Sequence, residues 1–111
     1  MVQECIFCKI GSGQIATDLL YEDQNVVAFK DVNPKAPTHI LVIPKRHVET
    51  LSRLDDTTLM EKLFSVVRII CTKLSLEHYR VVINNGKGAG QEVFHLHLHI
   101  LSGRKFSWPP G

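Results

Sequence analysis

A short stretch near the C-terminal end of the sequence places three histidines at alternate positions. It reads HLHLHI, at residues 95–100, and it holds half of the six histidines of the chain. If this stretch is a β-strand, its side chains alternate between the two faces of the strand. The three histidines then share one face, which we expect to be solvent-facing, and the three aliphatic residues share the face toward the core. The two sets are His95, His97, His99 and Leu96, Leu98, Ile100.

Two kinds of chemistry could use three imidazoles in this pattern. One metal ion held by all three is disfavoured, because the outer rings start about 13 Å apart along a strand, whereas imidazole nitrogens bind zinc at about 2.0–2.1 Å. Nucleophilic catalysis on phosphate fits better, since a neutral imidazole is a good nucleophile near pH 7. The glycine-rich loop NNGKGAG at residues 84–90 precedes the histidines. Glycines allow close approach of the backbone, and its N–H groups can bind an anion.

The elements that must position these residues alternate with turn signals along the chain. Apolar residues at three- and four-residue spacing predict one amphipathic helix of roughly 18 residues, capped by Asp55 or Asp56 and ending near Leu74. Strands before and after a single long helix indicate an α+β fold with an antiparallel sheet. The predicted strands cover residues 19–22, 26–30, 40–43, 79–83 and 95–101.

Composition limits the classes of function. The length of 111 residues suits a single domain over residues 1–111, and a net charge of +2 is too small to indicate a nucleic-acid partner. We expect no membrane span and no secretory signal. Three cysteines, an odd number, argue against a disulfide framework and predict a reducing compartment, the cytoplasm or the nucleus.

The HLHLHIL stretch resembles the signature of the histidine-triad (HIT) superfamily, and the tail SWPPG at residues 107–111 is similar to that of the Hint branch. Segments 21–23, 28–31, 36–39 and 41–45 carry the resemblance over most of the chain. It implies a five-stranded antiparallel sheet with one long helix and a short N-terminal helix, paired as a homodimer. It also implies a purine nucleoside phosphoramidase, which cleaves the P–N bond of nucleoside 5′-phosphoramidates of the AMP–amine type and needs no metal for catalysis. A nucleotide-binding regulatory or scaffold protein with little turnover is the alternative.

The resemblance also implies roles for individual residues. His97 would attack phosphorus and form a nucleotidyl-histidine, and His39 would orient it from behind. His99, with Asn84 and the backbone around Gln91, would hold the phosphate. Asp31 would bind the ribose hydroxyls, which a carboxylate can accept. The remaining substrate contacts are Phe7, Ile10, Phe29 and Val32 at the base, Gly90, Glu92 and Val93 near the phosphate, and Trp108 from the partner subunit. Glu92 stands where family members usually have Ser or Thr.

The N-terminal sequence contains a Cys-x-x-Cys motif, Cys5-Ile-Phe-Cys8, which has the spacing of metal ligands. Some HIT proteins with such a motif bind zinc with two histidines, which match His47 and His95 by position. A structural Zn²⁺ site of Cys5, Cys8, His47 and His95 is therefore expected. Two alternatives stay open, namely reduced cysteines without metal and a thioredoxin-like redox pair. The latter is disfavoured because no βαβ unit is predicted around the motif. Cys71, on the long helix, reads as a buried apolar residue.

Overall fold

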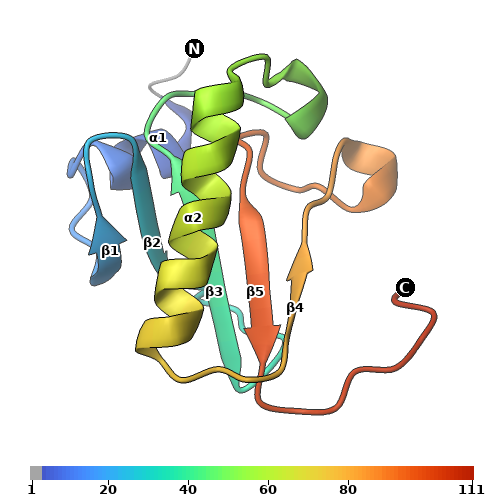
Figure 1. Ribbon diagram of the computed structural model, residues 1–111. Helices are drawn as coiled ribbons and strands as arrows, with labels where there is room; N and C mark the ends of the chain where they lie inside the picture. Colours follow the sequence, from blue (N-terminus) through green and yellow to red (C-terminus); the bar gives the residue numbers. More distant parts are fainter. Residues whose placement is uncertain (1–3) are drawn as a thin grey trace.

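The computed structural model describes residues 4–111, in which two helices pack on a five-stranded antiparallel sheet (Figure 1). The spatial order of the strands is β1-β2-β3-β5-β4, so β1 and β4 form the edges. The predicted α+β class is confirmed, with both the long helix and the short N-terminal helix. The strands are β1 (Leu19–Glu22), β2 (Val26–Lys30), β3 (Thr38–Pro44), β4 (Tyr79–Val82) and β5 (Leu98–Ser102). The helices are α1 (Ile6–Gly11) and α2 (Thr57–Lys73), with 3₁₀ turns η2 (Leu51–Arg53) and η3 (Lys87–Ala89).

The long helix α2 begins and ends close to the predicted residues. Of the two candidate caps, Asp56 is the N-cap, and its side chain accepts the backbone N–H of Leu59. A carboxylate at this position satisfies an N–H group that has no partner inside the helix. The buried residues of α2 pack on one face of the sheet and form the larger core. They are Leu59, Leu63, Val66, Val67, Ile70 and Cys71.

Both faces of the central strands are buried. Along β2 and β3, alternate residues such as Val26 and Ile40 face α2, whereas Val27 and Leu41 belong to a second, smaller core. Phe7 and Ile10 of α1 complete this smaller core. Leu96, Leu98 and Ile100 lie in the α2 core as predicted.

The histidine face is not solvent-facing, so that prediction was wrong. His95 is fully buried, with 0% of its surface exposed, and His97 is 7% exposed. The reason is the short helix α1, whose Phe7 ring lies edge-on to both imidazoles. The sequence pattern does not reveal this cover, because α1 is too short to show helical periodicity.

The predicted strand at residues 95–101 was also partly wrong, because β5 begins only at Leu98. Residues 95–97 run in an irregular segment whose polar groups have other partners. The Leu96 N–H donates to the carbonyl of Val48, and the His97 side chain bonds the carbonyl of His95. The three histidines therefore enter three different environments instead of one continuous row.

No helix in the part of the chain that the structure describes is both long enough and apolar enough to cross a membrane.

Candidate functional site

The first histidine lies in a cluster of four metal-type donors. Cys5 and Cys8 at the start of α1 meet His47, after β3, and His95. The His95 Nδ1 atom is 3.3 Å from the Cys5 Sγ and 3.4 Å from the Cys8 Sγ. The His47 Nδ1 atom is 3.3 Å from both the Cys8 Sγ and the His95 Nδ1. The residues predicted to bind zinc are thus brought together from three separate parts of the chain.

The spacing of these donors fits a tetrahedral zinc ion. With Zn–N bonds of about 2.0–2.1 Å and Zn–S bonds of about 2.3 Å, a tetrahedron separates two nitrogens by about 3.3 Å and nitrogen from sulfur by about 3.6 Å. The His95 tautomer fits too. Its Nε2 is 2.7 Å from the Pro44 carbonyl, which can only accept, so Nδ1 keeps a lone pair toward the sulfurs.

The surroundings of Cys8 and His95 disfavour the charged forms of both side chains. Burial, followed by the neighbouring Cys5 thiol, raises the pKa of Cys8 to about 11. Burial lowers the pKa of His95 to about 4, with smaller effects from the charges of His47 and His97. A bound cation would reverse the effect on the thiol, because metal ligands are held in their deprotonated forms.

The middle histidine presents a free nitrogen. The His97 Nδ1 is 2.7 Å from the main-chain carbonyl of His95. A carbonyl only accepts, so Nδ1 carries the hydrogen and Nε2 keeps its lone pair. The rings of His97 and His99 have centroids 4.9 Å apart. This arrangement gives His97 the tautomer that a nucleophilic imidazole needs.

The third histidine ends a chain of hydrogen bonds. The backbone N–H of Lys35 donates to His39 Nδ1 at 2.9 Å, so His39 must carry its hydrogen on Nε2. That Nε2 lies 2.9 Å from His99 Nδ1. His99 therefore carries its own hydrogen on Nε2, which is buried and has no hydrogen-bond partner among the described residues. An unpaired buried donor of this kind is suited to an anionic ligand.

The hydrogen bond of His39 goes to a different histidine from the one expected, which was His97. Its ring contacts His99, on the neighbouring strand, with centroids 5.2 Å apart, and its hydrogen bond goes to His99 and not to His97. The register explains the contact, because His39 and Leu41 lie on one face of β3 and Leu41 pairs with His99. Burial lowers the pKa of both His39 and His99, that of His99 to about 4. Both rings are therefore neutral at pH 7.

Asp31 follows β2 and lies beside this pair, with its Oδ2 atom 3.4 Å from His39 Nε2. The other carboxylate oxygen, Oδ1, accepts the backbone N–H of Asn33 at 2.9 Å. Asp31, His39 and His99 have the spacing of a second group of metal-type donors. Since the two imidazoles already hydrogen-bond each other, we interpret the group as a hydrogen-bonded chain.

The glycine-rich loop is held by the side chain of Gln91. Its Oε1 accepts the backbone N–H of Gly86, and its Nε2 donates to the carbonyls of Glu49 and Val93. Gly86 and Gly90 have φ angles of 93° and 95°, a region that favours glycine. The buried amide of Gln91 thus shapes the loop, while Asn84 is half-buried and Glu92 is exposed.

The residues predicted to line a base pocket fall into two groups. Phe7, Ile10 and Phe29 lie in the smaller core, where the Phe7 and Phe29 rings meet edge to face at 5.8 Å. Val32 is 100% exposed. Buried core positions and an exposed loop position do not by themselves form a closed pocket.

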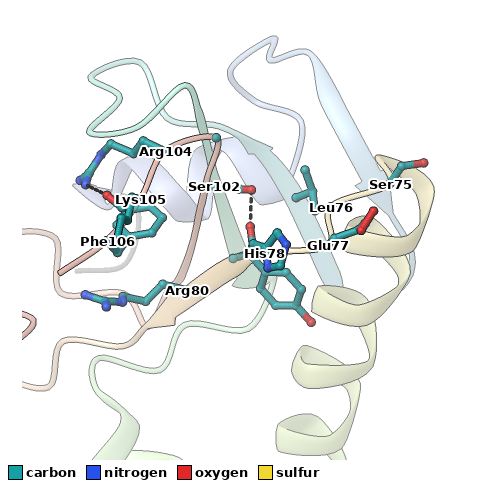
Figure 2. Close-up of a pocket in the computed structure, with 11 residues that line it drawn as sticks. Ser75, Leu76, Glu77, His78, Arg80, Ser102, Arg104, Lys105 and Phe106 are labelled. Carbon is teal, nitrogen blue, oxygen red and sulfur yellow. Dashed lines mark hydrogen bonds between the residues drawn. The ribbon is translucent and has the colours of Figure 1, made fainter. Parts of the chain in front are cut away.

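The C-terminal tail carries Trp108 and borders a cavity, which His78 lines but His95, His97 and His99 do not. Trp108 is 81% exposed, in a tail that extends away from the sheet beyond β5 (Figure 1). A cavity of about 720 Å³ lies where this tail starts, beside the edge strand β4 (Figure 2). The guanidinium groups of Arg80 and Arg104 lie over the Phe106 ring at 5.2 and 4.2 Å. None of the predicted site residues lines this cavity.

Sequence reasoning missed the main-chain partners of the site. The carbonyls of Pro44 and His95 and the N–H of Lys35 set which ring nitrogen of each histidine is free. Main-chain groups are present at every position, so no residue type signals which of them will be used.

Comparison with known proteins agrees with this geometry. A family model described as the HIT domain matches residues 12–106, a range that includes all three histidines and leaves out Cys5 and Cys8. An uncharacterised HIT-like protein of Synechocystis is 47% identical over 114 residues, which cover 100% of both chains. A 14 kDa zinc-binding protein of Zea mays is 42% identical over 120 residues, with 96% of this chain and 87% of that protein covered.

Solved structures resemble the chain over most of its length. A HIT family hydrolase of Legionella pneumophila superimposes with a TM-score of 0.90 at 43% identity, covering 96% of this chain and 99% of that one. A histidine triad protein of Clostridium difficile gives a TM-score of 0.89 at 42% identity, with 94% of each chain covered. With its three alternating histidines and its five-stranded sheet, the chain belongs to the HIT domain family.

Proposed function

We propose that this protein is a hydrolase that cleaves the P–N bond of purine nucleoside 5′-phosphoramidates, with His97 as the nucleophile. The observation that carries the proposal is the 2.7 Å hydrogen bond from His97 Nδ1 to the His95 carbonyl, which leaves the lone pair of Nε2 available for attack. The similarity to a Legionella pneumophila protein titled a HIT family hydrolase supports hydrolysis in general. The tail WPPG and the intact histidine triad support the phosphoramidate substrate through their resemblance to the Hint branch.

In the first step, the lone pair of His97 Nε2 forms a bond to phosphorus while the P–N bond of the substrate breaks. The leaving amine takes up a proton from solvent and departs, and the nucleotide stays bound to His97. In the second step, water attacks phosphorus, the bond to His97 breaks, and AMP or GMP is released. Splitting the hydrolysis in this way replaces one difficult displacement by two easier ones.

The neighbours of His97 supply charge stabilisation and position. The hydrogen on His99 Nε2 has no partner among the described residues and would donate to a phosphoryl oxygen, as oxyanion-binding donors do. His39 and the Lys35 N–H hold that hydrogen on Nε2. The carboxylate of Asp31 would accept the ribose hydroxyls. Glu92 is exposed, so its carboxylate can point into solvent, away from the phosphate.

Zn²⁺ held by Cys5, Cys8, His47 and His95 is the cofactor part of the proposal, with a structural role. The donor spacing supports it, as does the similarity to a zinc-binding protein of Zea mays. Zinc would fix the start of α1 to the segment that carries His97, and catalysis needs no metal. Metal analysis of protein purified without chelator tests this: about one equivalent per chain is expected, with loss in Cys5→Ser, and less than a tenth of an equivalent contradicts the site.

A homodimer completes the proposal. The strand β4 has a free edge, and the cavity beside it is lined by Arg80, Arg104 and Phe106 (Figure 2). Trp108 is 81% exposed and follows Ser107, whose carbonyl accepts a hydrogen bond from Arg80 of β4. A second copy seated on this edge would cover the cavity, and its tail could bring Trp108 to the neighbouring active site.

The decisive experiment compares nucleotide release from adenosine and guanosine phosphoramidates by the intact protein and by two His97 variants. His97→Ala removes the ring. His97→Asn keeps an N–H near the position of Nδ1 for the His95 carbonyl, so it is the better-folded control for a buried site. Both should lose at least about 10²–10³-fold in rate, and the intact protein should yield a nucleotidyl-histidine on acid-free quenching. More than a few per cent of the rate in a folded His97→Asn protein would refute the assignment. Tight nucleotide binding without turnover by the intact protein would favour the regulatory alternative.

A further inference from the structure

The Cys-x-x-Cys motif lies at the start of α1, the short N-terminal helix that the resemblance implied. Cys5 is the N-cap of α1, and its Sγ accepts the backbone N–H of Cys8 at 3.4 Å. Both thiols are half-buried, within reach of solvent, whereas Cys71 is buried. Two cysteines across the first turn of a helix, one of them accepting an N–H bond, form a dithiol arrangement suited to disulfide exchange.

We propose that Cys5 and Cys8 are a redox-active pair, which a low-molecular-weight disulfide converts into a Cys5–Cys8 disulfide with release of zinc, and that this change displaces His97. The inference rests on the zinc site of the proposed function and extends it to a modification site. The four donor atoms all lie within 4.8 Å of one another. The Cys5 and Cys8 sulfurs are two of these atoms, so an S–S bond of about 2.05 Å requires them to approach by at most about 2.8 Å.

A low-molecular-weight disulfide such as oxidised glutathione serves as the oxidant in this exchange. The Cys5 sulfur, which would be held as a thiolate as a zinc ligand, attacks one glutathione sulfur and expels the other glutathione as a thiolate. The Cys8 thiolate then attacks the Cys5 sulfur, and the second glutathione thiolate leaves. The two cysteines lose two electrons, the glutathione disulfide gains them, and the glutathione thiolates take protons from water. Zinc, left with His47 and His95, dissociates.

Two contacts would carry the change to the nucleophile. Phe7 lies between the two cysteines in sequence, and its ring centroid is 5.2 Å from that of His97 and 5.9 Å from that of His95. His95 is at once a member of the donor cluster and the residue whose carbonyl holds His97 Nδ1. A rearranged first turn of α1 and a released His95 side chain therefore act on the same imidazole.

The test uses the full chain, loaded with zinc and incubated with oxidised glutathione. Three measurements are made: zinc release to a chromophoric chelator, the Cys5–Cys8 peptide by mass spectrometry, and the ¹⁵N imidazole spectrum of His97. We expect one zinc released per disulfide formed, a shifted His97 signal, and reversal by dithiothreitol with added zinc. Cys71→Ala is the matched control and should behave like the intact chain.

Two further variants separate the steps. Cys8→Ser should trap one glutathione on Cys5, because the resolving thiol is missing. His47→Ala lacks a zinc ligand but keeps both thiols, so it should form the disulfide with no zinc to release. The proposal is overturned if the zinc-loaded chain keeps both thiols in excess oxidised glutathione, if Cys71 is the residue modified, or if His97 is unchanged by oxidation. A chain that loads no zinc contradicts the proposed metal site and the release step, and the linked peptide and the His97 spectrum then decide the dithiol. Absence of phosphoramidase activity changes none of these readouts.

Discussion

His95 should make the metal-free protein unstable in mild acid. The ring is 0% exposed and its pKa is lowered to about 4 by burial, whereas a histidine in the unfolded chain titrates near 6.5. As the pH falls below about 6.5, the unfolded state takes up a proton that the folded state does not. Stability from this group is therefore complete above about pH 6.5 and is lost as the pH falls toward 4. Integrating between these two pKa values gives a loss of about 2 kcal/mol at pH 5.

The assay is urea unfolding of chelator-treated protein at pH 7 and pH 5, compared with the variant His95→Gln. A glutamine amide can reach the position of Nε2 and keep the donor for the buried Pro44 carbonyl, at 2.7 Å in the intact chain, but it does not titrate. Other groups, including His99, are common to both proteins and cancel in the comparison. The variant should lose about 2 kcal/mol less than the intact chain between the two pH values. Equal losses in the two proteins would refute the assignment of a buried, neutral His95.

Three further outcomes are expected. His39→Phe removes the donor to His99 Nδ1 and should lower kcat, though by less than the about 10²–10³-fold cost of deleting an oxyanion donor. His39→Gln can restore an N–H at this position and should recover most of the rate. An unchanged His99 imidazole spectrum in His39→Phe would contradict this role. The chain should sediment as a dimer at micromolar concentration, and a strict monomer would refute the dimer. Trp108→Ala should reduce kcat/KM while leaving the free energy of unfolding nearly unchanged, since the ring is 81% exposed. Glu92→Ser should be tolerated because Glu92 is exposed, and a large loss of activity at every pH would show that its carboxylate faces the phosphate.

Local patterns in the sequence predicted α2 and the approximate places of the strands, whereas the short helix α1 was implied by the family resemblance. The three- and four-residue spacing of apolar residues predicted α2 to within two residues at its start, because one face of that helix packs on the sheet. The alternation in HLHLHI correctly assigned Leu96, Leu98 and Ile100 to the core. The candidate residues of the metal site came from a resemblance and a spacing, and the fold brings all four together. The predictions of α2 and of the core residues depend on residue type and short-range periodicity, which a single sequence displays directly.

Only the tertiary structure decided what each histidine can do. The burial of His97 depends on Phe7, 90 residues earlier in the chain, and the contact of His39 with His99 depends on the register between β3 and β5. The free nitrogen of each ring is fixed by main-chain groups, such as the Pro44 carbonyl for His95 and the His95 carbonyl for His97. Main-chain carbonyls are chemically alike at every residue. Which of them meets an imidazole is therefore determined by the path of the chain in space and not by the residue types along it.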